Sequence, residues 1–179
     1  MTLDPIFESC FAPLLGLPCW QVKPGYGSCI TMEFGEPHLE IREPKVFASD
    51  RSPKVREMFA RRNVTVRGEW DLWIYCCDWS ILNAKQIVGF SDDDASYCAA
   101  TQFLDGQALT SVTVDSLAST RFSFDLGGLL TTSPYDDSEQ WMLYNPDGNV
   151  LSLRADGSYS YHPSNTVPND EVWLPVWTP

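Results

Sequence analysis

Short runs of alternating apolar and polar residues are the dominant pattern along the chain. Ile30, Met32 and Phe34 alternate with polar neighbours, and Phe122 and Phe124 do the same in the second half. A period of two is typical of strands with one buried face. Further runs of this kind contain Trp70, Leu72, Ile74, Trp141 and Leu143. The pattern predicts a mainly β protein with minor α content and mostly antiparallel strands.

Two segments have the signals of short helices. Ser52 is followed by Pro53, which is a typical N-cap with proline at the first helical position. The second segment begins at Ser91, where three successive aspartates favour a helix N-terminus, and its apolar stripe stops near Gly106. We therefore expect one or two short helices, the second of which would connect the two halves of the chain.

Glycine, proline, asparagine and aspartate mark the turns between the predicted strands. An Asp-Gly pair at the centre of residues 149–161 predicts a β-hairpin there. The last segment, residues 162–179, contains four prolines, so we expect an extended tail. Trp173 and Trp177 are expected to hold this tail against the body.

Comparison of the chain with itself reveals two blocks of similarity. At a shift of 90 positions the matched residues are Leu14 with Leu104, Gly16 with Gly106, Val22 with Val112, Phe34 with Phe124 and Leu39 with Leu129. At a shift of 69 they are Tyr75 with Tyr144, Asp78 with Asp147 and Leu82 with Leu151. The blocks keep their order along the chain. They predict duplicated antiparallel sheets packed with pseudo-two-fold symmetry.

We therefore expect a single domain over residues 1–179 with an internal repeat. Repeat 1 covers about residues 14–90 and repeat 2 about residues 104–161, and the Pro/Trp tail 162–179 follows. The length agrees with one domain, because domains usually contain about 100–200 residues.

The two shifts differ by 21 residues, which places an insertion in repeat 1. The inserted segment 42–67 contains eight of the twelve basic residues and three of the 24 acidic residues, a net charge of +5. The rest of the chain carries −17. Because a repeated scaffold already specifies the fold, an insertion on it is a common place for added function.

The overall composition excludes several classes of protein. A hydrophobic fraction of 44% predicts a folded core, and a net charge of −12 argues against a nucleic-acid partner. No run approaches the roughly 18 apolar residues of a membrane span, and the first residues lack the basic start of a secretory signal. We expect a cytoplasmic protein with no membrane contact and with reduced cysteines.

Motifs for catalysis or metal binding are missing from the sequence. His38 and Glu40 could form a metal-binding or acid–base pair, but a surface histidine beside a turn is the simpler interpretation. With only His38 and His162 in the chain, a His-rich metal site is excluded. Cys76 and Cys77 would point to opposite faces of a strand, so they are unsuited to chelating one ion. We predict no catalytic residue, no cofactor and no metal.

The candidate partner-binding residues are the bases of the insertion and two neighbouring tryptophans. They are Arg51, Lys54, Arg56, Arg61, Arg62, Trp70 and Trp73. Arginine and tryptophan are the side chains most enriched at the centres of protein interfaces. The alternative is that these bases pair with acidic loops of the same molecule, in exposed ion pairs worth about 0–1 kcal/mol each.

The second repeat also carries a resemblance to known proteins. The residues that carry it, between about 104 and 161, are Leu104, Gly106, Val112, Phe122, Phe124, Trp141 and Leu143. This spacing resembles uncharacterised bacterial β-rich domain families, some of whose members are similar to toxin-immunity proteins. The resemblance implies a small cytosolic protein that acts by binding, without catalysis, and it supplies no catalytic residues.

Three functions agree with these observations. The first is a noncatalytic bacterial protein-binding protein, which is immunity-like and uses its acidic surface or the inserted segment. The second is a small-molecule binder or enzyme with a cleft between the repeats, where Trp and Tyr side chains could stack on a sugar or nucleobase. The third is a structural subunit of an oligomer, joined through the Trp173–Trp177 tail. The partner and the oligomeric state stay open.

Overall fold

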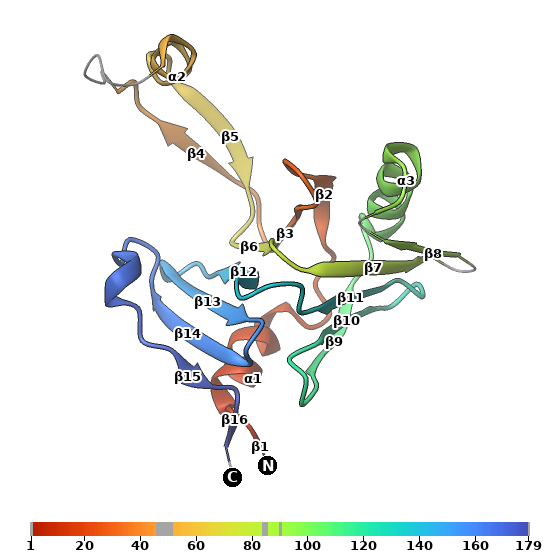
Figure 1. The fold of residues 1–179 in the computed structure, drawn as a ribbon. Helices are drawn as coiled ribbons and strands as arrows, with labels where there is room; N and C mark the ends of the chain where they lie inside the picture. The colour runs from red at the N-terminus through yellow and green to blue at the C-terminus, as the bar shows by residue number, and fades with distance from the viewer. Residues whose placement is uncertain (1, 46–51, 84–85, 90, 179) are drawn as a thin grey trace.

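The computed structural model describes residues 2–45, 52–83, 86–89 and 91–178. It confirms a mainly β protein made of antiparallel sheets with a few short helices (Figure 1). The larger sheet has seven strands and the smaller has five. The two sheets are therefore unequal in strand number, although both are antiparallel throughout.

The seven-stranded sheet contains strands from both halves of the chain. In spatial order they are β15 (Leu174–Pro175), β14 (Ser158–Pro163), β13 (Asn149–Arg154), β12 (Glu139–Tyr144), β6 (Trp70–Ile74), β3 (Ile30–Phe34) and β2 (Trp20–Pro24). The predicted hairpin of residues 149–161 is present as β13 and β14. At the centre of the sheet, β6 of the first half pairs with β12 of the second, with Trp73 opposite Met142.

The five-stranded sheet also contains strands from both halves of the chain. In spatial order its strands are β8 (Gln86–Gly89), β7 (Asp78–Asn83), β11 (Leu129–Ser133), β10 (Thr120–Phe124) and β9 (Leu109–Val114). The chain passes between the sheets where β6 leads into β7 and where β11 leads into β12 (Figure 1). Because each sheet joins a block of strands from the first half to a block from the second, neither half has a separate core.

The core lies where the two sheets and the first helix meet. Trp141 of β12 is fully buried, and its ring packs edge-on against Phe122 of β10 at 6.0 Å and against Phe11 at 5.6 Å. The indole Nε1–H of Trp141 donates to Thr120 Oγ1 at 2.9 Å. Its polar atom is therefore satisfied inside the apolar cluster, as a buried tryptophan requires.

The described residues contain three α-helices, so the prediction of one or two was wrong. The helix that the sequence analysis missed is α1 (Pro5–Phe11), which is followed by a 3₁₀ turn, η1 (Ala12–Leu14). Asp4 caps α1 by accepting from the Ile6 N–H, and proline occupies its first position. At seven residues the helix is too short to be stable alone, and the burial of Phe7 and Phe11 holds it in place.

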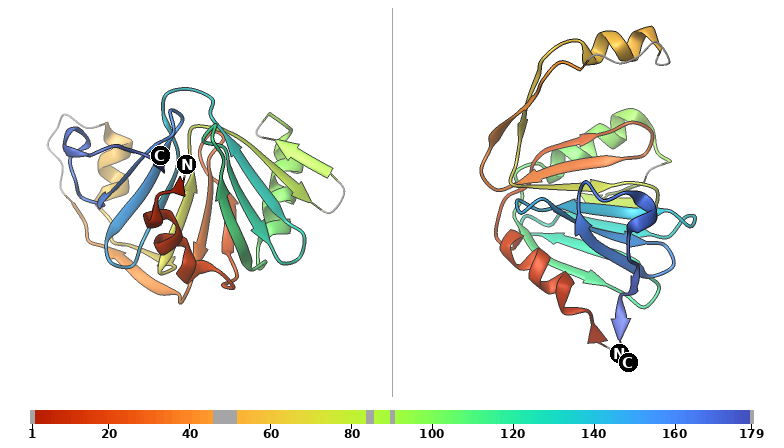
Figure 2. Two further views of the ribbon diagram at one scale, coloured as in Figure 1. Left: turned by 90° about the horizontal axis from the view of Figure 1, so that it is seen from below. Right: turned by 90° about the vertical axis from the view of Figure 1, so that its left-hand side faces the viewer.

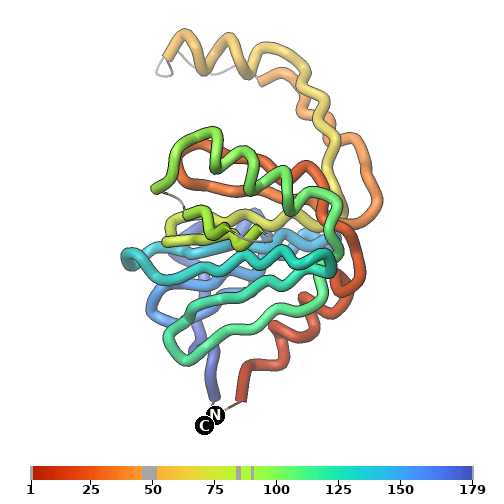
Figure 3. Tube along the Cα trace, turned by 90° about the vertical axis from the view of Figure 1, so that its right-hand side faces the viewer, coloured from red at the N-terminus to blue at the C-terminus, as the bar shows by residue number. Residues whose placement is uncertain are grey.

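The two predicted helices are present. Ser52 caps α2 (Pro53–Phe59) as expected. The other, α3 (Asp94–Leu104), begins later than the predicted Ser91, because Asp93 accepts from the N–H groups of Ala95 and Ser96 and so acts as the N-cap. Helix α3 lies beside β2 and joins the two halves, as Figure 3 shows.

The segment that the sequence comparison predicts to be an insertion forms an arm that projects from the body (Figures 1 and 2). Strands β4 (His38–Arg42) and β5 (Asn63–Arg67) pair only with each other, and α2 lies at the far end of this ribbon. We call β4, α2 and β5 the arm. Its bounds extend the predicted insertion of residues 42–67 by one strand, because β5 needs β4 as its partner.

The tail runs along the body as predicted, with a short 3₁₀ turn, η2 (Pro168–Asp170), within it. Trp173 covers the Arg154 guanidinium at 3.6 Å, and the Nε1–H of Trp177 donates to the carbonyl of Asp115 at 3.0 Å. The short strands β1 (Thr2–Leu3) and β16 (Trp177–Thr178) pair, so both ends of the chain lie together. No described helix is both long and apolar enough to cross a lipid bilayer.

Residues around Gly16 and residues around Gly106, which are 90 positions apart, form reciprocal backbone hydrogen bonds with each other. The Gly16 N–H donates to the carbonyl of Leu109 at 2.7 Å, and the Gly106 N–H donates to the carbonyl of Cys19 at 2.8 Å. Gly16 and Gly106 have the same φ of 89°, in the left-handed region that favours glycine. Each glycine is the second residue after a helical segment, because η1 ends at Leu14 and α3 at Leu104.

Candidate functional site

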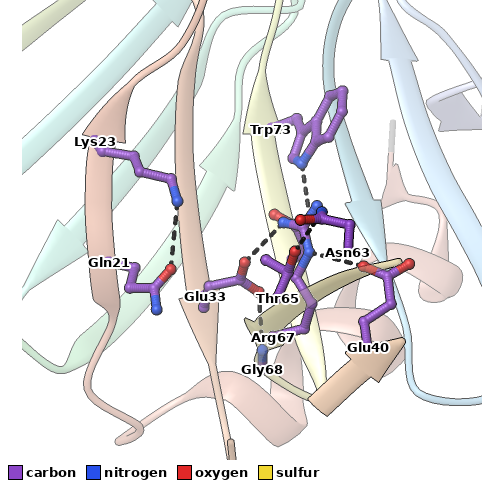
Figure 4. Close-up of polar contacts among 10 residues, drawn as sticks. Gln21, Lys23, Glu33, Glu40, Asn63, Thr65, Arg67, Gly68 and Trp73 are labelled. Atoms are coloured by element: carbon purple, nitrogen blue, oxygen red, sulfur yellow. Dashed lines mark hydrogen bonds and ion pairs between the residues drawn. The ribbon is translucent and has the colours of Figure 1, made fainter. Parts of the chain in front are cut away.

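A cluster of charged side chains joins the base of the arm to the larger sheet (Figure 4). Arg67, the last residue of β5, donates from Nη1 to Glu33 Oε1 at 3.0 Å and to Asp71 Oδ2 at 3.2 Å. Its Nε donates to Glu40 Oε2 of β4 at 3.2 Å. One guanidinium thus contacts three carboxylates from three strands, and we call these four residues the Arg67 cluster.

The two carboxylates on the sheet face each other directly. Glu33 of β3 and Asp71 of β6 are register partners, and like charges in such cross-strand pairs repel. Glu33 is only 1% exposed, and its second oxygen accepts from the Gly68 N–H at 3.0 Å. A buried carboxylate of this kind needs a cationic partner, and Arg67 provides it.

Gly68 lets the chain turn from the arm into β6 at close range. A Cβ at this position would clash with the carbonyl oxygen of Phe34. Any other residue would push the backbone away and break the bond from the Gly68 N–H to Glu33. The local sequence Arg67-Gly68 is therefore part of the cluster, and glycine is required for its close approach.

The environment of Asp71 favours its protonated form. Burial is the main cause, the charge of Glu33 adds to it, and together they raise the pKa of Asp71 to about 6. A bond of 2.7 Å from the Trp73 Nε1–H and the charge of Arg67 act in the opposite direction but are outweighed. The second oxygen, Oδ1, is buried and has no hydrogen-bond partner. Asp71 is thus a carboxyl group that titrates near neutral pH.

A cavity of about 610 Å³ lies between the base of the arm and the larger sheet. Trp73 and Tyr144 form its aromatic side, with their rings 5.8 Å apart at 60°. The remaining lining includes His38, Glu40, Arg67, Glu69, Asp71 and Asn145. Aromatic rings beside several carboxylates suit a ligand with an apolar face and hydrogen-bond donors, such as a sugar or an amine. His38 and Glu40 line this cavity and both are exposed, which agrees with the simpler interpretation of His38 as a surface residue.

The basic residues predicted as the partner site lie at the other end of the arm. Lys54, Arg61 and Arg62, together with Arg42 and Met58, line a second cavity of about 640 Å³ between α2 and the end of the ribbon. Arg56 lies on α2 and is exposed, while Arg51 is outside the described residues. We call α2 and the adjoining end of the ribbon the tip of the arm. The tip is a basic surface that also contains an apolar side chain, Met58.

The expected intramolecular ion pairs at the tip are few and local. Arg61 pairs with Glu57 at 3.3 Å and Arg62 with Glu43 at 2.9 Å, and all four side chains are more than 60% exposed. Such pairs contribute about 0–1 kcal/mol each. Both acids belong to the inserted segment itself, so these described pairs do not dock the tip onto acidic loops of the body.

One face of the ribbon is apolar and open. Leu39 pairs with Val66 and Ile41 with Val64, so all four side chains lie on the same face. Their exposed fractions are 63%, 40%, 55% and 53% respectively. We call these residues the apolar face of the arm. An isolated two-stranded ribbon is marginally stable in water, and open apolar patches usually mark contact surfaces.

The two predicted tryptophans lie on the sheet and do not join the basic tip. Trp73 belongs to the cavity at the arm base, whereas half-buried Trp70 lines a different, smaller hollow with Cys10 and Asn145. The predicted set is therefore divided among three places. The Arg67 cluster was missed, although a charged residue within each of two apolar strands, Glu33 and Asp71, is a signal for paired buried charge.

Burial raises the pKa of five thiols of the chain. Burial is the main cause that raises the pKa of Cys19 and Cys77 to about 12, and it also raises those of Cys10, Cys29 and Cys76. A nucleophilic cysteine needs the opposite shift. Within the described part of the chain, His, Cys, Asp and Glu side chains form no group of three or more that could hold a metal ion.

Comparison of the chain with protein-family models, with curated proteins and with solved structures gives no match.

Proposed function

We propose that this chain is a noncatalytic protein-binding protein and that the arm is its binding surface. The observation that carries the proposal is the apolar face of the arm, with four aliphatic side chains open on a ribbon that projects from the body. Burying such side chains is worth about 1.5–3 kcal/mol each when they are fully covered. A bound partner would bury these side chains, and their burial would stabilise the ribbon.

The chemistry of the arm defines the kind of partner. The cavity at the tip has four cationic side chains and one carboxylate, Glu57, on its walls. An acidic protein surface with an apolar centre complements both parts of the arm, because charge would guide the encounter and the aliphatic contact would hold the complex. A bacterial, cytosolic and immunity-like role follows from the sequence resemblance, and it belongs to this proposal.

The test compares the full chain with a shortened arm. The tagged full-length protein and a variant in which residues 40–65 are replaced by Asn-Gly are used to capture partners from the cells of origin. We expect a partner that binds the full chain, is lost from the variant, and associates more slowly as salt is raised. Equal capture of that partner by both proteins would contradict the proposal.

A second candidate function is favoured by the cavity at the arm base. Trp73 and Tyr144 beside Asp71, whose pKa is raised to about 6, resemble a site for a small ligand with hydrogen-bond donors. Thermal unfolding with a panel of sugars, amines and nucleosides tests it, because a ligand of the folded state raises the melting temperature. The shift should disappear in Tyr144→Ala, and a panel without any shift would dismiss this candidate.

We also propose that residues 14–90 and 104–161 are two copies of one unit. The support is the reciprocal bonding of residues 90 positions apart around the bridge of Pro18 with Ala108. The Cys19 N–H donates to the carbonyl of Gln107 at 2.9 Å, and its counterpart Leu109 donates to the carbonyl of Leu17 at 3.0 Å. Trp73 and Met142, which are 69 positions apart, are register partners. This pairing does not belong to the same relation as the shift of 90, because β3 pairs with β6 whereas β10, its counterpart at that shift, pairs with β9 and β11 and not with β12.

A further inference from the structure

We infer that the arm binds the arm of a second copy of this chain, so that the protein is a two-fold dimer with crossed arms. The inference rests on the proposed function, since it identifies the partner of the same surface. In this dimer the apolar face of one arm packs against the apolar face of the other. Each tip then lies against the body of the opposite copy.

The first argument is that the apolar face is complementary to itself. A two-fold interface brings the same patch together from both copies, so that patch must contain nothing that repels its own image. Leu39, Ile41, Val64 and Val66 are uncharged, and the charged residues of the ribbon, such as Arg67 and Glu40, lie on the opposite face. Two ribbons can stack through such faces at about 10 Å, the ordinary spacing of packed sheets.

The second argument is the distribution of charge. The segment 42–67 carries +5, and the rest of the chain carries −17. Arms that crossed in the same direction would bring two basic tips together, which is unfavourable. Arms that cross in opposite directions place each basic tip beside the acidic body of the other copy, where opposite charges attract. The charge asymmetry thus selects the antiparallel arrangement.

The third argument is the area that a stable dimer requires. Each ribbon strand has five residues, which span about 17 Å, so the two apolar faces alone cover far less than the roughly 800 Å² per partner of a standard interface. The tip must therefore add contact. Its cavity between α2 and the ribbon is open, and Met58 within it is 54% exposed. In the antiparallel arrangement, the tip of each arm contacts the body of the other copy and so adds to the buried area.

The test is the molar mass of the full chain in solution over a concentration series. We expect a dimer that dissociates on dilution, and a dissociation constant that rises with salt. Ile41→Glu would place a carboxylate in the apolar face and should raise the dissociation constant by at least about thirtyfold, as loss of a central anchor does. Leu126→Glu makes the same change at an exposed turn of the body, outside the arm, and should leave it unchanged.

Hydrogen exchange gives a second measurement that needs no variant. The backbone amides of β4 and β5 should exchange more slowly at high protein concentration than at low, because the ribbons cover each other in the dimer. A chain that stays monomeric at all concentrations overturns the inference, and so does a dimer that Ile41→Glu leaves intact. If the monomeric chain still captures another protein through its arm, the proposed function stands without a second copy. If the shortened arm changes neither capture nor mass, both fail.

Discussion

At the scale of single residues, Arg67 determines how the arm is attached to the body. Its side chain contacts β3, β4 and β6 together, through Glu33, Glu40 and Asp71. Burial lowers the pKa of Arg67, but the hydrogen bonds and charges of these acids outweigh burial and raise it. Arg67 therefore stays charged, and the position of the arm depends on an electrostatic contact at its base.

Removing this charge should destabilise the whole fold. In Arg67→Met, Glu33 would remain buried without a cation, so we expect the free energy of unfolding to fall by about 3 kcal/mol. Arg62→Met is the matched control, because its partner Glu43 is exposed, and it should cost less than about 1 kcal/mol. Denaturant titrations of both variants measure the difference. Equal effects would show that the Arg67 cluster does not hold the structure.

The pKa of Asp71 predicts a dependence of stability on pH. Its folded-state pKa of about 6 lies above the ordinary value of 3.8, so the folded state binds the proton more tightly than the unfolded state does. The contribution is therefore complete below about pH 4 and is lost as the pH rises through 6. In Asp71→Asn this loss is absent, and stability relative to the wild type should improve by about 2 kcal/mol between pH 4 and pH 7.

The control for this prediction is Asp137→Asn, at an exposed carboxylate far along the chain. Denaturation at a series of pH values measures both variants. A constant difference between Asp71→Asn and the wild type would mean that folding does not raise the pKa of Asp71.

At the scale of elements, the arm is separate from the core. Among the residues that the structure describes, the arm contributes none to the buried cluster, and α2 has no buried residue. Replacing residues 40–65 with Asn-Gly keeps the pair of Leu39 with Val66 and closes it with a two-residue turn that suits a hairpin. We expect the shortened chain to unfold cooperatively, with a change of less than about 1 kcal/mol. Loss of cooperative unfolding in the shortened chain would show that the folded core depends on the arm.

The helices differ in how well local signals specified them. The caps of α2 and α3 have local signals in the sequence, since Ser52 and Asp93 accept from first-turn N–H groups. The cap of α1, Asp4 before Pro5, is equally visible, but seven residues give too little periodicity to predict a helix. Its stability comes from Phe7 and Phe11 in the core, which is a tertiary contribution.

At the scale of the whole molecule, the tail closes the fold. Val176 is fully buried, its N–H donates to the carbonyl of Gly157, and its carbonyl accepts from the Asp4 N–H. Val176→Asp would bury a charge without a partner, so we expect a loss of at least about 3 kcal/mol. Val172→Asp, at a position that is 68% exposed, is the control and should have little effect. Thermal unfolding of both distinguishes a docked tail from a loose one.

The proposed duplication also belongs to this scale. In an experimental structure, the backbone of residues 12–34 should superpose on that of residues 102–124, with Gly16 on Gly106. Each helix should also contact the first strand of the opposite copy, as α3 contacts β2 and as α1 residues share an apolar hollow with Val112 of β9. Halves that follow different paths would leave the sequence similarity without a structural basis.

The sequence was sufficient for properties that depend on neighbouring residues. Alternation predicted the strands at Ile30–Phe34 and Thr120–Phe124, because one buried face imposes a period of two. The sequence also shows that most of the positive charge lies in residues 42–67 of a chain whose net charge is −12. The tertiary structure alone decided which strands pair, that Glu33 meets Asp71 and Arg67, and that the insertion stands away from the body with its aliphatic side chains uncovered. These depend on register and packing between distant segments, which local patterns do not encode.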